Sequence, residues 1–133
     1  MNQKKSLMRA KEKPLTHLQL RIMNILWDCG DATVAEVQEA LKSEKELART
    51  TVATLIARLE KQGYISHRKT ERARRYYPLV EQREIQESMV TELVDTLFQG
   101  KRSSLVSHLL SMRKVHSKEI EEVIKMIKEK QEK

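Results

Sequence analysis

Residues 49–65 read RTTVATLIARLEKQGYI, and this stretch decides how the rest of the chain is interpreted. Its apolar residues recur three or four positions apart, which is the spacing of one buried helix face: Val52, Leu55, Ile56 and Leu59. Gly63 ends the pattern. Thr50, Thr51 and Thr54 occupy the first turns, although each threonine costs a helix about 0.5 kcal/mol relative to alanine. We therefore asked what these threonines face.

The opposite face of this helix begins with small side chains and ends with basic ones. At about 100° per residue, the outward positions are Thr50, Thr54, Ala57, Arg58 and Lys61. Small hydroxyl side chains let a helix N-terminus approach DNA closely, where threonine can contact a thymine methyl group or a phosphate. This pattern favours a DNA-recognition helix. The alternative is an ordinary amphipathic helix in which Thr50 or Thr51 is the cap.

Two more helices are expected upstream. Thr16 is predicted to cap the first, which ends at Gly30, and Cys29 is interpreted as a small buried residue of its stripe. The rest of that stripe is formed by Leu18, Ile22, Ile25 and Leu26. Residues 33–36 have the pattern of a capping box, Thr-x-x-Glu, so they predict a short second helix that ends near Lys42.

A hairpin is expected downstream, because residues 64–68 and 75–79 alone have strand character. Around its tip lie five cations within eight positions: Arg68, Lys69, Arg72, Arg74 and Arg75. Each phosphate that they neutralise would add about 0.9 to the salt slope of binding. One of Tyr76 and Tyr77 should pack on the core. The alternative is a solvated loop in which some of these cations contact nothing.

Three helices followed by a basic hairpin predict a mainly α chain with a winged helix-turn-helix domain, whose third helix enters the DNA major groove. Residues 1–80 contain 16 Lys+Arg and 9 Asp+Glu, whereas residues 81–133 contain 10 of each, so the first part carries the whole net charge of +7. We therefore expect a disordered basic arm over residues 1–14, a DNA-binding domain over 15–80 and a helical dimerisation region over 81–133.

The last region should form three amphipathic helices that bury their apolar stripes against a second copy. The predicted dimerisation residues are Ile85, Met89, Leu93, Leu97, Phe98, Leu105, Leu109, Ile120, Ile124 and Ile127. The alternative is a monomer whose tail packs on its own DNA-binding domain.

Other functions find little support in the composition. The chain shows no apolar run near the roughly 20 residues of a membrane span and no apparent signal peptide, and its one cysteine fits a reduced, cytoplasmic setting. Its four histidines lack metal-ligand spacing. Residues 111–114 spell Ser-x-x-Lys, but the partner motifs of penicillin-binding enzymes are absent. We expect neither an enzyme nor a cofactor.

Several segments resemble the bacterial penicillinase repressors of the BlaI/MecI type and the related copper-responsive CopY repressors. The resemblance runs from about Leu15 through the last helix. It is carried by the segments IMNILW at 22–27, TVAEV at 33–37, TVATLIARLEKQGYI at 51–65 and YYPLV at 76–80. It implies a homodimer on an inverted-repeat operator, with the C-terminal helices as the dimer interface. Carried over by position, Thr50, Thr51 and Thr54 approach the bases, whereas Ala53 departs from the longer polar residue of some relatives.

Regulation departs further from the family pattern. In the β-lactam-responsive members, a membrane-bound metalloprotease sensor triggers cleavage at an Asn-Phe pair; here His108-Leu109 occupies that place. The Cys-x-Cys pairs of the copper-responsive members are absent. The resemblance therefore implies DNA, a second copy and a membrane metalloprotease sensor as partners, with no insertion of this chain into the membrane. Whether proteolysis or another signal releases the DNA stays open.

The leading hypothesis is a sequence-specific, DNA-binding transcriptional repressor. Its predicted DNA contacts are Arg49, Thr50, Thr51, Thr54, Arg58, Lys61, Arg68, Lys69, Arg72, Arg74 and Arg75. A non-specific nucleic-acid-binding or architectural protein is the alternative, since a basic arm and hairpin would suffice for it. A protein-interaction module that uses the winged helix as a scaffold is a third possibility.

Overall fold

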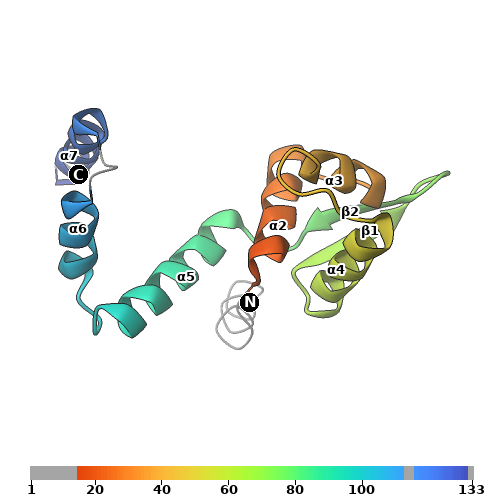
Figure 1. Cartoon of the computed structure of the whole chain (residues 1–133), viewed down its shortest axis with the longest axis horizontal. Helices are drawn as coiled ribbons and strands as arrows, with labels where there is room; N and C mark the ends of the chain where they lie inside the picture. Colours follow the sequence, from red (N-terminus) through yellow and green to blue (C-terminus); the bar gives the residue numbers. More distant parts are fainter. Residues whose placement is uncertain (1–14, 113–115, 132–133) are drawn as a thin grey trace. The chain divides into compact units, whose positions relative to one another are not determined.

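The computed structural model describes residues 15–112 and 116–131, and the predicted basic arm lies outside them. Its elements are α2 (His17–Cys29), α3 (Val34–Leu41), α4 (Arg49–Lys61), β1 (Ile65–Lys69), β2 (Arg74–Pro78), α5 (Gln82–Leu97), α6 (Arg102–Ser111) and α7 (Ser117–Gln131) (Figure 1). The predicted class, mainly helical with a winged helix-turn-helix, is confirmed. The chain divides into two compact units between Val90 and Thr91.

Local sequence signals set the ends of α2 and α3. Thr16 Oγ1 accepts a hydrogen bond from the Gln19 amide at 3.2 Å, and Gln19 Oε1 accepts one from the Thr16 amide at 3.1 Å. Thr33 and Glu36 form the same reciprocal cap on α3, at 3.1 and 2.9 Å. Gly30 ends α2 with a φ of 87°, a conformation that side chains with a Cβ rarely adopt. Both predicted caps are confirmed.

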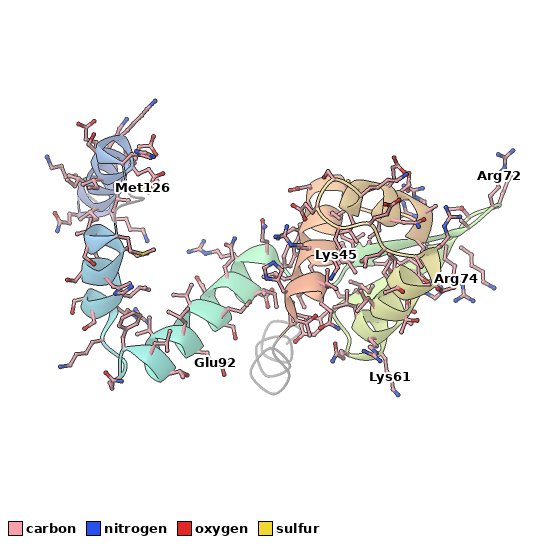
Figure 2. The ribbon with its side chains drawn as sticks, viewed as in Figure 1. Lys45, Lys61, Arg72, Arg74, Glu92 and Met126 are labelled. Atoms are coloured by element: carbon pink, nitrogen blue, oxygen red, sulfur yellow. The ribbon has the colours of Figure 1, made fainter. Side chains whose placement is uncertain are left out.

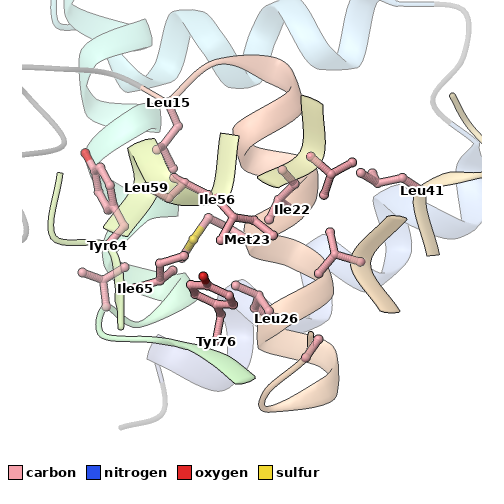
Figure 3. Packing of buried hydrophobic residues seen from close by; sticks show 14 of the residues in the cluster. Leu15, Ile22, Met23, Leu26, Leu41, Ile56, Leu59, Tyr64, Ile65 and Tyr76 are labelled. Carbon is pink, nitrogen blue, oxygen red and sulfur yellow. The ribbon is translucent and has the colours of Figure 1, made fainter. Parts of the chain in front are cut away.

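The core of the first unit forms where α2, α4 and the hairpin meet (Figure 3). Ile22, Met23 and Leu26 of α2 and Ile56 and Leu59 of α4 are completely buried. Burial of each such side chain is worth about 1.5–3 kcal/mol, so the apolar stripes explain why these helices pack.

The prediction that Cys29 is buried is wrong, because this side chain is exposed. The buried positions of α2 end at Leu26, and the last residues of the helix, Asp28 and Cys29, are exposed. A regular stripe in the sequence therefore continues beyond the neighbours that could cover it.

The two strands form an antiparallel hairpin in which Ile65 pairs with Pro78 and Lys69 with Arg74. Tyr76 is 8% exposed and packs in the core, whereas Tyr77 is half-buried, as expected for residues on opposite faces. In Figure 1 the hairpin projects from the cluster of α2, α3 and α4. Ala32 adds an isolated bridge to Tyr76, with backbone hydrogen bonds of 3.0 and 2.8 Å. The sequence patterns do not predict this bridge.

The first unit also includes the beginning of α5, so it ends ten residues after the predicted boundary at residue 80. Trp27 Nε1 donates a 2.9 Å hydrogen bond to the Val80 carbonyl, which fixes the segment that leads into α5. Ile85 is 1% exposed within the core, and Met89 packs against that core. The first two turns of α5 thus belong to the winged-helix domain.

Candidate nucleic-acid interface

None of the residues described in the structure covers the outer face of α4. Thr50, Thr51 and Thr54 are exposed, and so are Arg58 and Lys61 further along the helix. The side chains predicted to face inward are buried at Val52, Ile56 and Leu59 and half-buried at Leu55. The division of this helix into an apolar inner face and a small-then-basic outer face agrees with the structure; contact with DNA stays a prediction.

The threonines do not cap α4. Ala48 is the N-cap residue, and no side chain caps the first backbone amides. The Thr54 hydroxyl donates instead to the Thr50 carbonyl within the helix, at 2.9 Å. The helix therefore presents an uncapped N-terminus surrounded by small exposed side chains, an arrangement that can accept a phosphate.

Gln38 of α3 fixes the start of α4. Its amide nitrogen donates to the Leu47 carbonyl at 2.9 Å, and its amide oxygen accepts from Arg49 Nε at 3.0 Å. Gln38 thereby holds the predicted DNA contact Arg49 in place. The apolar periodicity of the sequence does not identify Gln38 as a functional residue. The only available signal was that a glutamine lies between the buried positions Val37 and Leu41.

The hairpin cations fall into two groups. Lys69, Arg72 and Arg74 are exposed and form no ion pair within the part of the chain that the structure describes. Figure 2 shows Arg72 at the far end of the hairpin and Lys61 on α4. Arg68 and Arg75, by contrast, are engaged within the protein. The five predicted hairpin contacts are therefore not equally available to a phosphate.

Asp31, in the turn between α2 and α3, holds both engaged arginines. Its Oδ1 contacts Arg75 Nε at 3.0 Å and Nη2 at 2.9 Å, and its Oδ2 contacts Arg68. Arg75 Nη2 also lies 3.0 Å from Glu36 Oε1. A hydrogen bond from Arg75 lowers the pKa of Asp31. The pKa of Glu36 is lowered by a hydrogen bond from the Thr33 amide and, to a smaller extent, by the charge of Arg75. Asp31 in turn raises the pKa of Arg75.

A second connection joins α4 to the hairpin. His67 Nδ1 of β1 lies 2.5 Å from Glu60 Oε2 of α4, and the His67 ring contacts the Tyr76 ring with centroids 5.4 Å apart. The His67 side chain is thus directed toward α4. The α4 helix and the hairpin are therefore linked by side chains as well as by the core.

The predicted dimerisation residues do not all lie on a surface. Ile85 is 1% exposed in the chain's own core, so it has no surface to offer a second copy, and Met89 packs against the same core. Half-buried positions are Phe98, Leu105 and Ile120. Exposed positions are Leu93, Leu97, Leu109, Ile124 and Ile127.

Several further exposed apolar side chains are not among the residues predicted for dimerisation. They are Val90, Val106, Leu110, Met112, Val123 and Met126. On α6 and α7 no residue is buried, so their apolar side chains are exposed or half-buried.

Other kinds of site find no support in the described residues. Within 15–112 and 116–131, no three His, Cys, Asp or Glu side chains gather closely enough to hold a metal ion. Among the helices that the structure describes, none combines the length and apolar character needed to cross a bilayer.

Comparison with known proteins identifies relatives over most of the chain. The model of the family described as "Penicillinase repressor" matches residues 15–129. The methicillin resistance regulatory protein MecI of Staphylococcus aureus strain N315 is 28% identical over 123 residues, covering 92% of this chain and 100% of MecI. The transcriptional regulator BlaI of Mycobacterium tuberculosis strain CDC 1551 is 33% identical over 103 residues, covering 76% of this chain and 75% of that protein.

Among solved structures, a MarR family protein from Bacillus stearothermophilus has a similar fold. It is 21% identical, with a TM-score of 0.50 over 99% of this chain and 86% of that chain.

Proposed function

The chain belongs to the penicillinase repressor family, and we propose that it represses transcription as a homodimer bound to an inverted-repeat operator. Its relatives are regulators by name, not enzymes. Such a repressor acts in the cytoplasm of a bacterium, where the DNA is.

The observation that carries the proposal is the exposed face of α4. Its uncapped N-terminus and the three exposed threonines allow the backbone to approach the floor of the major groove, while Arg58 and Lys61 lie toward the flanking phosphates. Threonine methyl groups suit contact with thymine. Base contacts in this proposal come from Thr50, Thr51 and Thr54.

The hairpin supplies backbone contacts beside this helix. Lys69, Arg72 and Arg74 are exposed and unpaired in the described structure, so they can meet phosphates without first breaking an ion pair. Phosphate contacts position a protein on the duplex but do not read sequence. The hairpin therefore raises affinity for every duplex, and α4 provides the discrimination.

The exposed apolar side chains of α5, α6 and α7 support the proposed pairing of two copies. Leu97 is 62% exposed and Met126 is 61% exposed, values that are unfavourable for a surface that stays in water. A two-fold interface would bury this surface in both copies at once. Two recognition helices could then enter half-sites centred about 34 Å apart, one turn of DNA.

Release of the operator in this proposal follows separation of the two copies. His108 and Leu109, at the position of the family's cleavage pair, are both exposed on α6. Either cleavage there by a membrane metalloprotease sensor or another signal that weakens the interface would have this effect. Incubation with such a sensor, followed by mass measurement of the products, distinguishes the two routes.

The test of function is a selection from random duplexes followed by titration at several salt concentrations. We expect a palindromic site bound at least about 10³-fold more tightly than a shuffled duplex, with two chains per site. A ratio near one would favour a non-specific architectural protein, and no binding at low salt would favour a protein-interaction module.

A further inference from the structure

One carboxylate, Asp31, contacts both strands of the hairpin. It binds Arg68 of β1 through Oδ2 and Arg75 of β2 through Oδ1. Its side chain is 22% exposed, less than those of its partners at 60% and 29%. The next residue, Ala32, exchanges two backbone hydrogen bonds with Tyr76. The hairpin is therefore tied to the turn between α2 and α3 by side chain and backbone together, at Tyr76 and at the neighbouring Arg68–Arg75 pair.

The hairpin register explains why a carboxylate is needed at this point. Arg68 pairs directly with Arg75 across the two strands, so two like charges are cross-strand neighbours. Such a pair is destabilising unless an opposite charge lies between its members. Asp31 supplies that charge, and Glu36 provides a further acceptor for Arg75 at 3.0 Å. Cations nearer the tip have no such acceptor among the described residues.

We propose that Asp31 is a positioning residue for operator recognition, which fixes the direction of the hairpin relative to α4 by holding Arg68 and Arg75. This inference rests on the proposed function. Arg75 is then a structural residue of the hairpin, and phosphate contact belongs to Lys69, Arg72 and Arg74. A hairpin of fixed direction discriminates between duplexes better than a freely oriented one, because the hairpin and α4 must then fit the same DNA at a fixed angle.

Electrostatics alone gives a different expectation. Asp31→Asn removes one negative charge near a polyanion and should strengthen binding to every duplex. A positioning role instead predicts a loss of discrimination, because the released arginines add phosphate contacts on any sequence while the hairpin loses its fixed direction. The two expectations differ in the ratio of affinities, not only in affinity.

The experiment compares Asp31→Asn with Asp28→Asn in the full chain. Asp28 is exposed and forms no ion pair among the described residues, so it is a matched control for charge. Dissociation constants are measured for the selected site and a shuffled duplex over a range of salt. Amide hydrogen exchange of the free protein is followed at Ala32 and Tyr76, whose N–H groups form the bridge.

For Asp31→Asn we expect at least a tenfold fall in the affinity ratio, a salt slope on shuffled DNA that rises by up to about 1.8, and faster exchange at Ala32 and Tyr76. Asp28→Asn should change neither the ratio nor the exchange. Equal behaviour of the two variants would overturn the inference. If Asp31→Asn does not fold, Arg75→Gln is measured instead, with the same outcomes for the ratio and exchange.

The inference and the proposed function can fail separately. A wild-type ratio near one would refute the proposed repressor. The exchange measurement needs no DNA, and unchanged exchange at Tyr76 in Asp31→Asn would refute the positioning role of Asp31 while leaving the proposed repressor intact.

Discussion

The two compact units use their apolar residues in opposite ways. In the first, Ile22, Val52 and Ile56 are completely buried, and α2, α3 and α4 share one core. In the second, α6 and α7 bury no residue at all. Both units contain amphipathic helices, so periodicity does not distinguish them. The difference indicates that the first unit is stable by its own packing, whereas the second has an apolar surface that a partner would cover.

The largest expected effect is the difference in unfolding free energy between a leucine-to-alanine substitution in the first unit and one in the second. Leu59→Ala removes a completely buried side chain from the core and should lower the free energy of unfolding by about 2–5 kcal/mol. Leu97→Ala, at a residue that is 62% exposed, should leave the unfolding of the first unit within about 0.5 kcal/mol of wild type. Urea unfolding followed by Trp27 fluorescence measures both.

Equal losses from these two variants would contradict the comparison, since Leu97 would then be part of the same folding unit. The control is Leu79→Ala, a residue of the first unit that is 50% exposed, which should resemble Leu97→Ala in stability.

The second prediction concerns association. Ile124→Glu places a charge within the exposed apolar surface of α7 and should weaken dimerisation at least tenfold, about 1.4 kcal/mol. Lys125→Glu, at the adjacent exposed position, makes a larger change in charge without removing an apolar contact. Sedimentation velocity over a range of concentrations compares them. A wild-type chain that is monomeric at every concentration would refute the dimer.

The third prediction assigns DNA contact to the first unit. Arg72→Ala should weaken binding to the operator and to a shuffled duplex by similar factors, and should reduce the salt slope by about 0.9 per copy. Lys118→Ala removes an exposed cation of the second unit and should leave the slope unchanged. Salt-dependent fluorescence anisotropy measures both, and an unchanged slope in Arg72→Ala would refute the role of the hairpin.

The smallest expected effect is on pH dependence. Arg75 holds the pKa of Asp31 below its ordinary value of 3.8, so the Asp31 contribution to stability is present above pH 3.8 and is lost as pH falls through the lowered pKa. The thermal midpoints of wild type and Asp31→Asn should therefore differ at neutral pH and converge in strong acid. A constant difference at all pH values would contradict the ion pair as its source.

Much of the first unit could be predicted from local patterns. Thr16 and Gly30 mark the ends of α2, and the division of α4 into two faces follows from a period of 3.6 residues. The failures were non-local. The exposure of Cys29 depends on which neighbours reach it. The contacts of Asp31 with Arg68 and Arg75 join residues that are 37 and 44 positions apart.

The boundary between the units illustrates the same limit. A stripe in α5 predicts which side of the helix is apolar but does not specify what covers it. The structure assigns Ile85 to the core of the first unit and leaves Leu93 and Leu97 exposed. One continuous pattern in sequence thus serves two purposes, and only the tertiary contacts show where the change occurs.

The claim that the outer face of α4 reads DNA is tested most directly by selecting binding sites for variants of that face. Full-length Thr51→Ala, Thr54→Ala and Arg72→Ala are each used to select duplexes from the same random pool as wild type. We predict that each threonine variant selects altered bases at symmetric positions of the two half-sites, whereas Arg72→Ala selects the wild-type site. Recovery of the wild-type site by both threonine variants would contradict the account.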